Sequence, residues 1–153
     1  MDKFKVLLVD DEEEFITSLG ERLELREMDA KTALSGEAAL ELVTDEVPDV
    51  MVLDLRMPGI DGLEVLRRVK KRYPQVQVVV LTGHGTDKDE VEARKHGAYE
   101  YLQKPVDLDK LVSTLKKAYR DKVKDTMTAV AFAEEGDFNT ARSITDKKKT
   151  DKK

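Results

Sequence analysis

The chain has 153 residues, 40% of them hydrophobic and 39% charged, which is the size of one ordinary domain. It has no cysteine and two histidines, which excludes disulfide frameworks, thiol nucleophiles and histidine-rich metal sites. No apolar run approaches the roughly 20 residues that cross a bilayer, and the N-terminus does not resemble a signal peptide. We therefore expect a cytoplasmic protein with no membrane segment.

The net charge is −5, from 27 basic and 32 acidic residues. Residues 121–153 hold eight basic and seven acidic side chains, which leaves 19 basic and 25 acidic for residues 1–120. The main body is therefore acidic. Because nothing in this balance attracts a polyanion, we do not expect nucleic acid to be a partner.

Short apolar runs alternate with stretches that carry apolar residues every three or four positions, a pattern typical of strands followed by amphipathic helices. The predicted strands are 6–9, 29–33, 50–53, 76–81 and 99–102. Helices are predicted around 15–23, 38–43 and 63–69, followed by a polar helix ending near Gly97 and a last helix starting near Asp107.

This alternation predicts an α/β fold with a parallel sheet covered by helices on both faces. The first, third and fourth strands are unbroken apolar runs and belong in the interior, whereas 29–33 and 99–102 are mixed and belong at the edges. A doubly wound five-stranded sheet of order 2-1-3-4-5, the flavodoxin-like order, satisfies both conditions with right-handed crossovers.

Polar residues follow the strands at their carboxyl ends, where open parallel sheets bind ligands. Asp10 and Asp11 follow the first strand, Asp54 the third, Thr82 the fourth and Lys104 the fifth. Crowded carboxylates repel unless a cation lies among them, and oxygen-coordinated Mg²⁺ meets that need. A carboxylate can also become an aspartyl phosphate, with a lysine on a phosphate oxygen. The pattern predicts a magnesium-dependent phosphoryl-transfer site.

Each of these residues also has a structural explanation when taken alone. Acids at 10–14 suit a helix N-terminus, Asp54 suits a turn, and Thr82 suits a strand or a cap. We favour the functional interpretation because independent structural roles would have to converge on one edge by chance. His84 and His96 are interpreted as a loop residue near the site and a helix C-terminal cation, neither of them catalytic.

Five segments carry a pattern known from other proteins: Val6–Asp11, Val52–Gly59, Asp61–Gly62, Leu81–Gly83 and Gly97–Pro105. With these segments, over about residues 3–120, the chain resembles the receiver domain of bacterial two-component response regulators. The stretch at 81–85 is most similar to receivers of transcriptional regulators that carry an ATPase and a DNA-binding domain.

The resemblance implies a role for each acidic position. Asp54 is the expected phosphoacceptor, Asp11 a direct Mg²⁺ ligand and Asp10 a ligand acting through water. The backbone carbonyl of Arg56 is the remaining expected protein ligand, and Lys104 is the lysine of the family that contacts the phosphoryl group.

Thr82 and Tyr101 match the switch pair of the family. The implied mechanism is that the phosphoryl group draws the Thr82 hydroxyl toward it and the Tyr101 ring turns inward, which reshapes the face formed by the fourth helix, fifth strand and fifth helix. Arg56 and His84 match positions that tune phosphate lifetime, and Pro105 sits where the family has a cis peptide bond.

The implied function is a phosphorylation-controlled receiver whose donor is a sensor histidine kinase or a phosphotransfer protein. Its partners are a downstream protein at the fourth helix–fifth strand–fifth helix face and, as a homodimer, a second copy. It is expected to catalyse only its own phosphorylation and dephosphorylation. One alternative is an Mg²⁺-dependent phosphohydrolase with Asp54 as nucleophile, although Leu55-Arg56 leaves no second acid two positions on. The other is a DNA-binding regulator that uses the tail.

The expected division is a receiver domain over 1–120, a helical extension or hairpin over 121–145, and a basic disordered tail over 146–153. No Gly or Pro occurs between Asp107 and Glu135, which permits one helix of about 29 residues. Gly136 then breaks the pattern, and a short second helix is expected after it.

Overall fold

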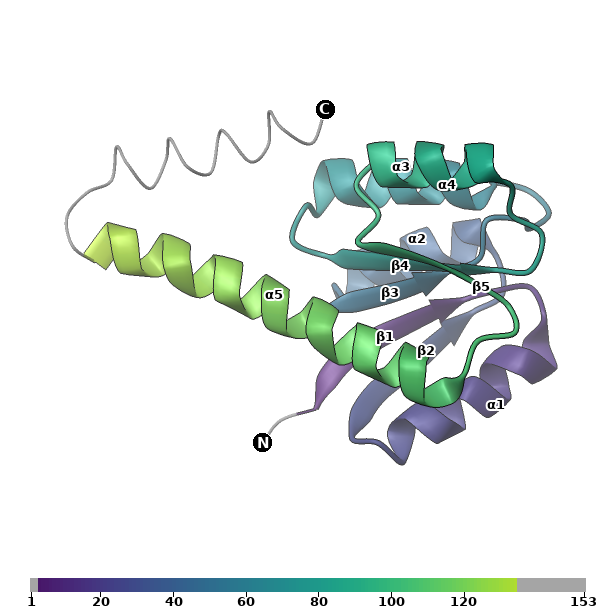
Figure 1. Ribbon diagram of the computed structural model, residues 1–153, viewed down its shortest axis with the longest axis horizontal. Helices are drawn as coiled ribbons and strands as arrows, with labels where there is room; N and C mark the ends of the chain where they lie inside the picture. Colours follow the sequence, from purple (N-terminus) through teal and green to yellow (C-terminus); the bar gives the residue numbers. More distant parts are fainter. Residues whose placement is uncertain (1–2, 135–153) are drawn as a thin grey trace.

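The computed structural model describes the backbone of residues 3–134 and the side-chain surroundings of residues 3–125. Within these residues five strands alternate with five helices (Figure 1). In chain order they are β1 (Phe4–Val9), α1 (Glu13–Glu24), β2 (Met28–Ala33), α2 (Gly36–Asp45), β3 (Val50–Leu53), α3 (Gly62–Arg72), β4 (Gln77–Thr82), α4 (Asp87–Lys95), β5 (Glu100–Gln103) and α5 (Leu108–Glu134).

The strands form one parallel sheet of order β2-β1-β3-β4-β5, which confirms the predicted fold. Strand β3 is buried along its whole length and β4 in all but its first residue, whereas β2 at the edge is buried only at its two ends. Helices α1 and α5 cover one face of the sheet, and α2, α3 and α4 cover the other (Figure 1).

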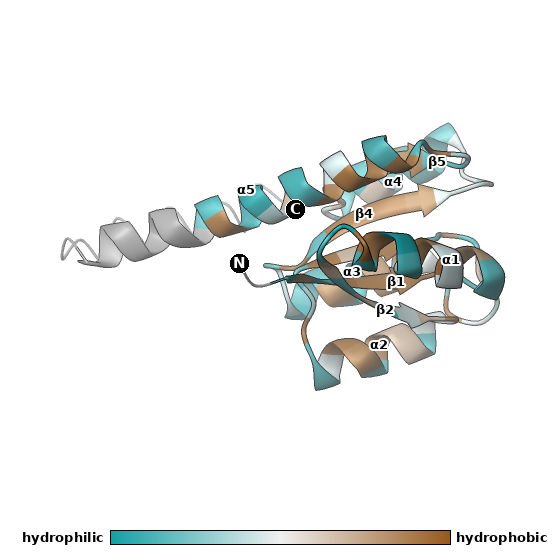
Figure 2. Cartoon of the chain, turned by 90° about the horizontal axis from the view of Figure 1, so that it is seen from below, coloured by the Kyte–Doolittle hydropathy of each residue, from teal (hydrophilic) through white to brown (hydrophobic). Residues whose placement is uncertain are grey.

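Alternate side chains of each strand enter different cores, as the two-residue period of a strand requires. On β1, Leu7 and Val9 pack in the core under α2 and α3, while Val6 and Leu8 pack in the core under α1 and α5. Figure 2 shows β4 hydrophobic along most of its length, whereas α5 carries both hydrophilic and hydrophobic residues. The sheet therefore separates two apolar layers, and its carboxyl-end edge stays polar.

Local hydrogen bonds explain where the helices begin. Ser35 and Asp61 cap α2 and α3 by accepting bonds from the amides of residues three positions later, at 3.1 and 2.9 Å. Thr86 and Asp89 form a reciprocal capping box at the start of α4, with both bonds at 3.1 Å. Gly97 follows α4 with φ of +97°, a conformation that favours glycine.

Helix α5 runs through position 120 without interruption and continues to Glu134. Contacts near the amino ends of the strands hold its middle. The Phe4 and Tyr119 rings stack with centroids 4.5 Å apart, the Tyr99 hydroxyl donates to Asp121 at 2.5 Å, and Lys122 pairs with a carboxylate oxygen of Asp49 at 2.5 Å. The predicted hairpin beyond Gly136 and the predicted basic tail lie outside the described residues. No helix in the described part of the chain is long and apolar enough to span a bilayer.

Candidate functional site

Backbone hydrogen bonds extend the sheet by one residue past the ends of β1, β3 and β5. The amide of Asp10 donates to Ala33 O at 3.1 Å, and the amide of Asp54 donates to Val9 O at 3.0 Å. The amide of Lys104 donates to Thr82 O at 2.9 Å. These bonds fix the backbone of the three predicted site residues, so their side chains emerge at the same edge of the sheet.

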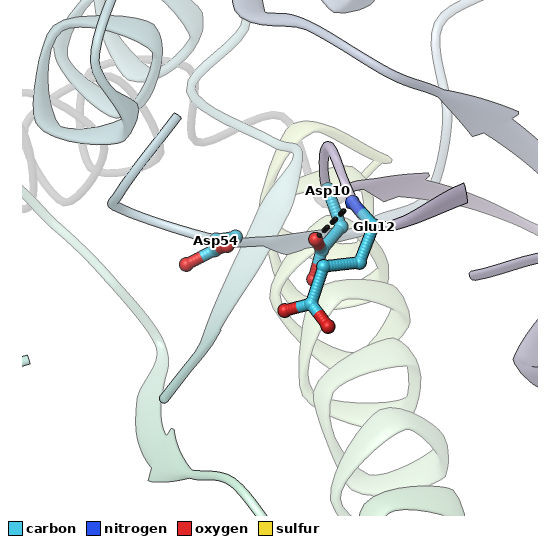
Figure 3. Close-up of side chains that lie close together, drawn as sticks. All are labelled: Asp10, Glu12 and Asp54. Atoms are coloured by element: carbon cyan, nitrogen blue, oxygen red, sulfur yellow. Dashed lines mark hydrogen bonds between the residues drawn. The ribbon is translucent and has the colours of Figure 1, made fainter. Parts of the chain in front are cut away.

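Three carboxylates meet at this edge (Figure 3). One oxygen from each of Asp10, Glu12 and Asp54 lies within 4.8 Å of the others. Asp10 and Asp54 are buried, with 3% and 5% of their surface exposed, whereas Glu12 is exposed. The Glu12 amide donates to Asp10 Oδ1 at 2.9 Å, and the Arg56 amide donates to Asp54 Oδ1 at 3.2 Å. Each buried carboxylate thus keeps its other oxygen for a further partner.

Lys104 supplies the positive charge of the site. Its Nζ lies 2.6 Å from Asp10 Oδ2, 3.1 Å from Glu12 Oε1 and 4.0 Å from Asp54 Oδ2. The same ammonium lies 4.4 Å from the centroid of the Phe15 ring, within the range of a cation–π contact. The lysine is therefore held over all three acids and pairs most closely with Asp10.

Burial is the largest single influence on the pKa values of Asp10 and Lys104. It raises the pKa of the Asp10 carboxyl, and the nearby Asp54 charge adds to that effect, although the bonds from Lys104 and from the Glu12 amide oppose it. Burial alone lowers the pKa of Lys104, but its bonds to Asp10 and Glu12 outweigh burial and raise it. Because a single lysine offsets the charge of only one carboxylate, the cluster of three carboxylates has an excess of negative charge.

Asp11 does not join this group, whereas Glu12 does. Asp11 is exposed, and the three-carboxylate group found in the described residues is Asp10, Glu12 and Asp54. Glu12 is the N-cap residue of α1, but its side chain makes no capping bond and reaches Lys104 instead. Sequence reasoning treated Glu12 only as part of an acidic helix start. Its spacing of two from Asp10 is the signal that could have identified it.

The predicted switch pair adjoins the site through Thr82, whose carbonyl oxygen accepts from the Lys104 amide. Thr82 is fully buried, with its Oγ1 accepting from the His84 amide at 3.4 Å. Tyr101 is 7% exposed, and its hydroxyl is the one buried polar side-chain atom in the described region without a hydrogen-bond partner. A Cβ atom added at Gly85 would lie 1.7 Å from that hydroxyl and 2.7 Å from Thr82 Cγ2. The Tyr101 ring is thus already inward in the unmodified chain.

The remaining predicted residues surround this centre. The Arg56 guanidinium Nη2 lies 2.5 Å from Asp89 Oδ2 and so pairs with α4. His84 is exposed on the loop after β4, and His96 lies 3.7 Å from Glu92 at the C-cap of α4. The peptide bond before Pro105 is cis, the geometry expected at this position.

Known proteins match both this sequence and this fold. The response regulator receiver domain family matches residues 6–116. A putative NtrX-like response regulator of Rickettsia typhi is 38% identical over 120 residues, which cover 77% of this chain and 25% of the relative. The structure of NtrX from Brucella abortus is 27% identical with a TM-score of 0.81, covering 88% of this chain and 30% of that one. A receiver domain from Clostridium thermocellum is 35% identical with a TM-score of 0.74, covering 78% and 96%.

The chain spans about a quarter of the length of the curated relatives that it matches. Receivers are phosphorylated by histidine kinases and bind Mg²⁺ at an acidic pocket, and they are not a family of turnover enzymes. The relatives are of the NtrX and NtrC type, which confirms the similarity to receivers of ATPase-type transcriptional regulators. Its sequence, sheet order and converging acids therefore place the chain in the receiver-domain family of two-component response regulators.

Proposed function

We propose that this receiver accepts a phosphoryl group on Asp54 from a sensor histidine kinase or a phosphotransfer protein. The observation that carries the proposal is the position of Lys104, whose ammonium lies 2.6 Å from Asp10 Oδ2 and 4.0 Å from Asp54 Oδ2. A cation poised between two buried acids neutralises the charge that a transferred phosphoryl group brings. The proposed role of the chain is signalling through its own modification, without turnover of a separate substrate.

The acidic cluster fits Mg²⁺. Three carboxylates lie within 4.8 Å of one another and face a single lysine, so two negative charges remain uncompensated, which matches a divalent cation with oxygen ligands. Asp10, Glu12 and Asp54 are the carboxylates that would surround the ion. The family resemblance predicts Asp54, Asp11 and the Arg56 carbonyl as direct ligands and Asp10 as a ligand acting through water. When bound, Mg²⁺ supplies charge neutralisation at the phosphoryl oxygens.

The chain's own residues prepare Asp54 for attack. The Arg56 amide holds Oδ1, which leaves Oδ2 as the nucleophilic oxygen. A bond forms between Oδ2 and phosphorus while the phosphorus–nitrogen bond of the donor phosphohistidine breaks, and the imidazole nitrogen keeps the electron pair. Lys104 then moves from Asp10 to a phosphoryl oxygen. The Thr82 hydroxyl, which accepts a bond from the His84 amide, is able to donate its own proton to the same group.

The proposed output surface is the face of α4, β5 and α5. Tyr101 lies on β5 with 7% of its surface exposed, and Val91 on α4 is 64% exposed. An exposed apolar side chain on an otherwise polar helix is suited to contact a protein partner. We propose that phosphorylation stabilises the inward Tyr101 conformer and so shifts the population toward the partner-binding form.

The phosphohydrolase alternative is not favoured. A hydrolase of that kind needs an acid–base group near its nucleophile, but the residue two positions after Asp54 is Arg56, whose side chain is paired with Asp89. The DNA-binding alternative rests on the tail, which lies outside the described residues.

Incubation with Mg²⁺ and acetyl phosphate tests the proposal. Wild-type chain should gain one phosphate that hydroxylamine releases, and Asp54→Asn should gain none. Asp61→Asn is the matched control, because Asn can replace Asp61 as the cap of α3 and should leave the labelling unchanged. Equal labelling of Asp54→Asn and wild type would refute the assignment.

A further inference from the structure

An ion pair joins the loop after Asp54 to helix α4. Arg56 lies two residues beyond Asp54, and its amide donates to Asp54 Oδ1 at 3.2 Å. Its guanidinium Nη2 donates to Asp89 Oδ2 at 2.5 Å, across a separation of 33 residues. The backbone of Arg56 therefore contacts the phosphoacceptor while its charge rests on another element.

Asp89 is the fixed partner of this pair. Its side chain is 14% exposed, against 52% for Arg56. Asp89 Oδ2 also accepts from the Thr86 amide at 3.1 Å, and its own amide donates to Thr86 Oγ1 at 3.1 Å. These bonds form the capping box of α4. Bonds from the Thr86 amide and from Arg56 outweigh burial and lower the pKa of Asp89, so the carboxylate is charged at neutral pH.

Phosphorylation creates a competitor for Arg56. A phosphoryl group adds nearly two negative charges and several strong acceptor oxygens, and a guanidinium binds phosphate through two parallel hydrogen bonds. Because the Arg56 amide already contacts Asp54, the guanidinium lies on a side chain long enough to reach a group on Oδ2. The guanidinium cannot direct its pair of parallel N–H donors to the Asp89 carboxylate and to the phosphoryl group at the same time.

We propose that Asp89 positions Arg56 by holding its guanidinium on α4, in competition with the phosphoryl group at Asp54. The inference rests on the proposed function of Asp54. The two interactions then oppose each other to the same extent. The ion pair with Asp89 weakens the binding of Arg56 to the phosphoryl group, and the phosphoryl group weakens the ion pair that ties Arg56 to the first turn of α4. This route from the site to α4 is separate from Thr82 and Tyr101.

The test measures the affinity of the full chain for beryllofluoride, a phosphoryl mimic, in the presence of Mg²⁺. Asp89→Asn keeps a side-chain oxygen for the Thr86 amide and removes the charge that holds Arg56. We expect about two- to fivefold tighter binding, the range that a partly exposed ion pair can supply. In an Arg56→Ala background, Asp89→Asn should have no further effect.

Asp87→Asn is the matched control, because Asp87 is an exposed acid in the same first turn of α4. It should leave the affinity unchanged, which separates the ion pair from the general field of α4. Hydrogen exchange at residues 87–90 gives a second measurement that a merely structural role would not alter. Beryllofluoride should accelerate this exchange in wild type and leave it unchanged in Arg56→Ala.

Two results overturn the inference. One is equal affinity of Asp89→Asn and Asp87→Asn, and the other is a gain from Asp89→Asn that persists without Arg56. In both cases the wild-type chain would still bind beryllofluoride. If instead the proposed function is wrong, wild type and Asp54→Asn will bind beryllofluoride equally poorly, so the two failures are distinguishable.

Discussion

The Nζ atom of Lys104 is bonded to Asp10 at 2.6 Å and stands off from Asp54 at 4.0 Å. In the unmodified chain the lysine therefore stabilises the neighbouring acid and makes no hydrogen bond to the phosphoacceptor oxygen. Asp10 and Asp54 are both buried, so the lysine also limits their mutual repulsion. Lys104 therefore contributes both to the stability of the fold and to the charge balance of the phosphorylation site.

Lys104→Met should destabilise the chain in the absence of metal. Removing one partner of a buried pair leaves the other charge uncompensated, and we expect a loss of about 3 kcal/mol in the free energy of unfolding. Saturating Mg²⁺ should recover part of this loss because it supplies the missing positive charge. Urea unfolding with and without Mg²⁺ measures both effects. Lys117→Met, at an exposed position on α5, is the control and should change neither value.

Binding of Mg²⁺ should weaken as the pH falls through the raised pKa of Asp10. Its folded-state pKa lies above the usual 3.8 because of burial, so the ionised carboxylate opposes folding at neutral pH and this penalty disappears on acidification. The metal needs the ionised form. The stabilisation by a fixed Mg²⁺ concentration should therefore shrink at pH values still above 3.8. Thermal unfolding with and without Mg²⁺ over a pH series measures this stabilisation. If the stabilisation by Mg²⁺ stayed constant down to pH 3.8, the prediction would be contradicted.

Gly85→Ala should drive the Tyr101 ring out of its inward position, because the new Cβ would lie 1.7 Å from the tyrosine hydroxyl. Nitration by tetranitromethane, located by mass spectrometry, should rise at Tyr101. Gly83→Ala is the matched control, since its Cβ would meet Lys104 Cδ at 3.6 Å, an ordinary contact. Unchanged nitration in Gly85→Ala would show that the ring has another way to accommodate the methyl group.

Two glycine-to-alanine substitutions should change the free energy of unfolding in opposite directions. Gly20 lies inside α1, and a Cβ there would be 3.7 Å from Leu8 and Thr32, so Gly20→Ala should stabilise the chain by about 0.5–1 kcal/mol. At Gly62 the Cβ would lie 2.3 Å from the carbonyl oxygen of Asp54, so Gly62→Ala must move the phosphoacceptor loop. It should lower both stability and labelling by acetyl phosphate. Chemical denaturation of the two variants gives the comparison.

The bond from Tyr99 to Asp121 should fail at high pH. Burial and this bond raise the pKa of Tyr99 from 10.0 to about 12. A raised pKa means that the neutral phenol stabilises the fold fully below pH 10.0, and that this contribution is lost as the pH rises through about 12. The stability difference between wild type and Tyr99→Phe should therefore narrow across this range. A pH-independent difference would indicate that the phenol contributes only through packing.

The architecture could be predicted because burial on both faces determines composition. The apolar runs at β1, β3 and β4 indicate the interior of the sheet, and the mixed sequence of β2 indicates an edge. This inference does not depend on how individual side chains pack. The same logic predicted the convergence of Asp10, Asp54 and Lys104, since parallel strands end at one edge. The limits of β3 match the prediction, and those of the other four strands differ from it by one or two residues at one or both ends, where hydrogen bonding and not composition sets the end.

Side-chain directions could not be predicted in the same way. Whether Asp11 or Glu12 faces Lys104 depends on the turn after β1, in which the Glu12 amide bonds to Asp10. The pairing of Arg56 with Asp89 joins residues 33 positions apart, and no periodic pattern encodes it. The inward ring of Tyr101 depends on the absence of a side chain at Gly85. Each is set by local geometry that only the folded chain reveals.

Helix α5 begins a few residues after Lys104 and continues, at 1.5 Å per residue, for about 40 Å to Glu134. Its contacts through Tyr119, Asp121 and Lys122 lie partway along this length. The side chains of Leu111, Leu115 and Ala118 also bury its first turns in the core. The first half of α5 is therefore fixed to the sheet, so a shift of the core beneath these residues carries the distal turns of the helix with it.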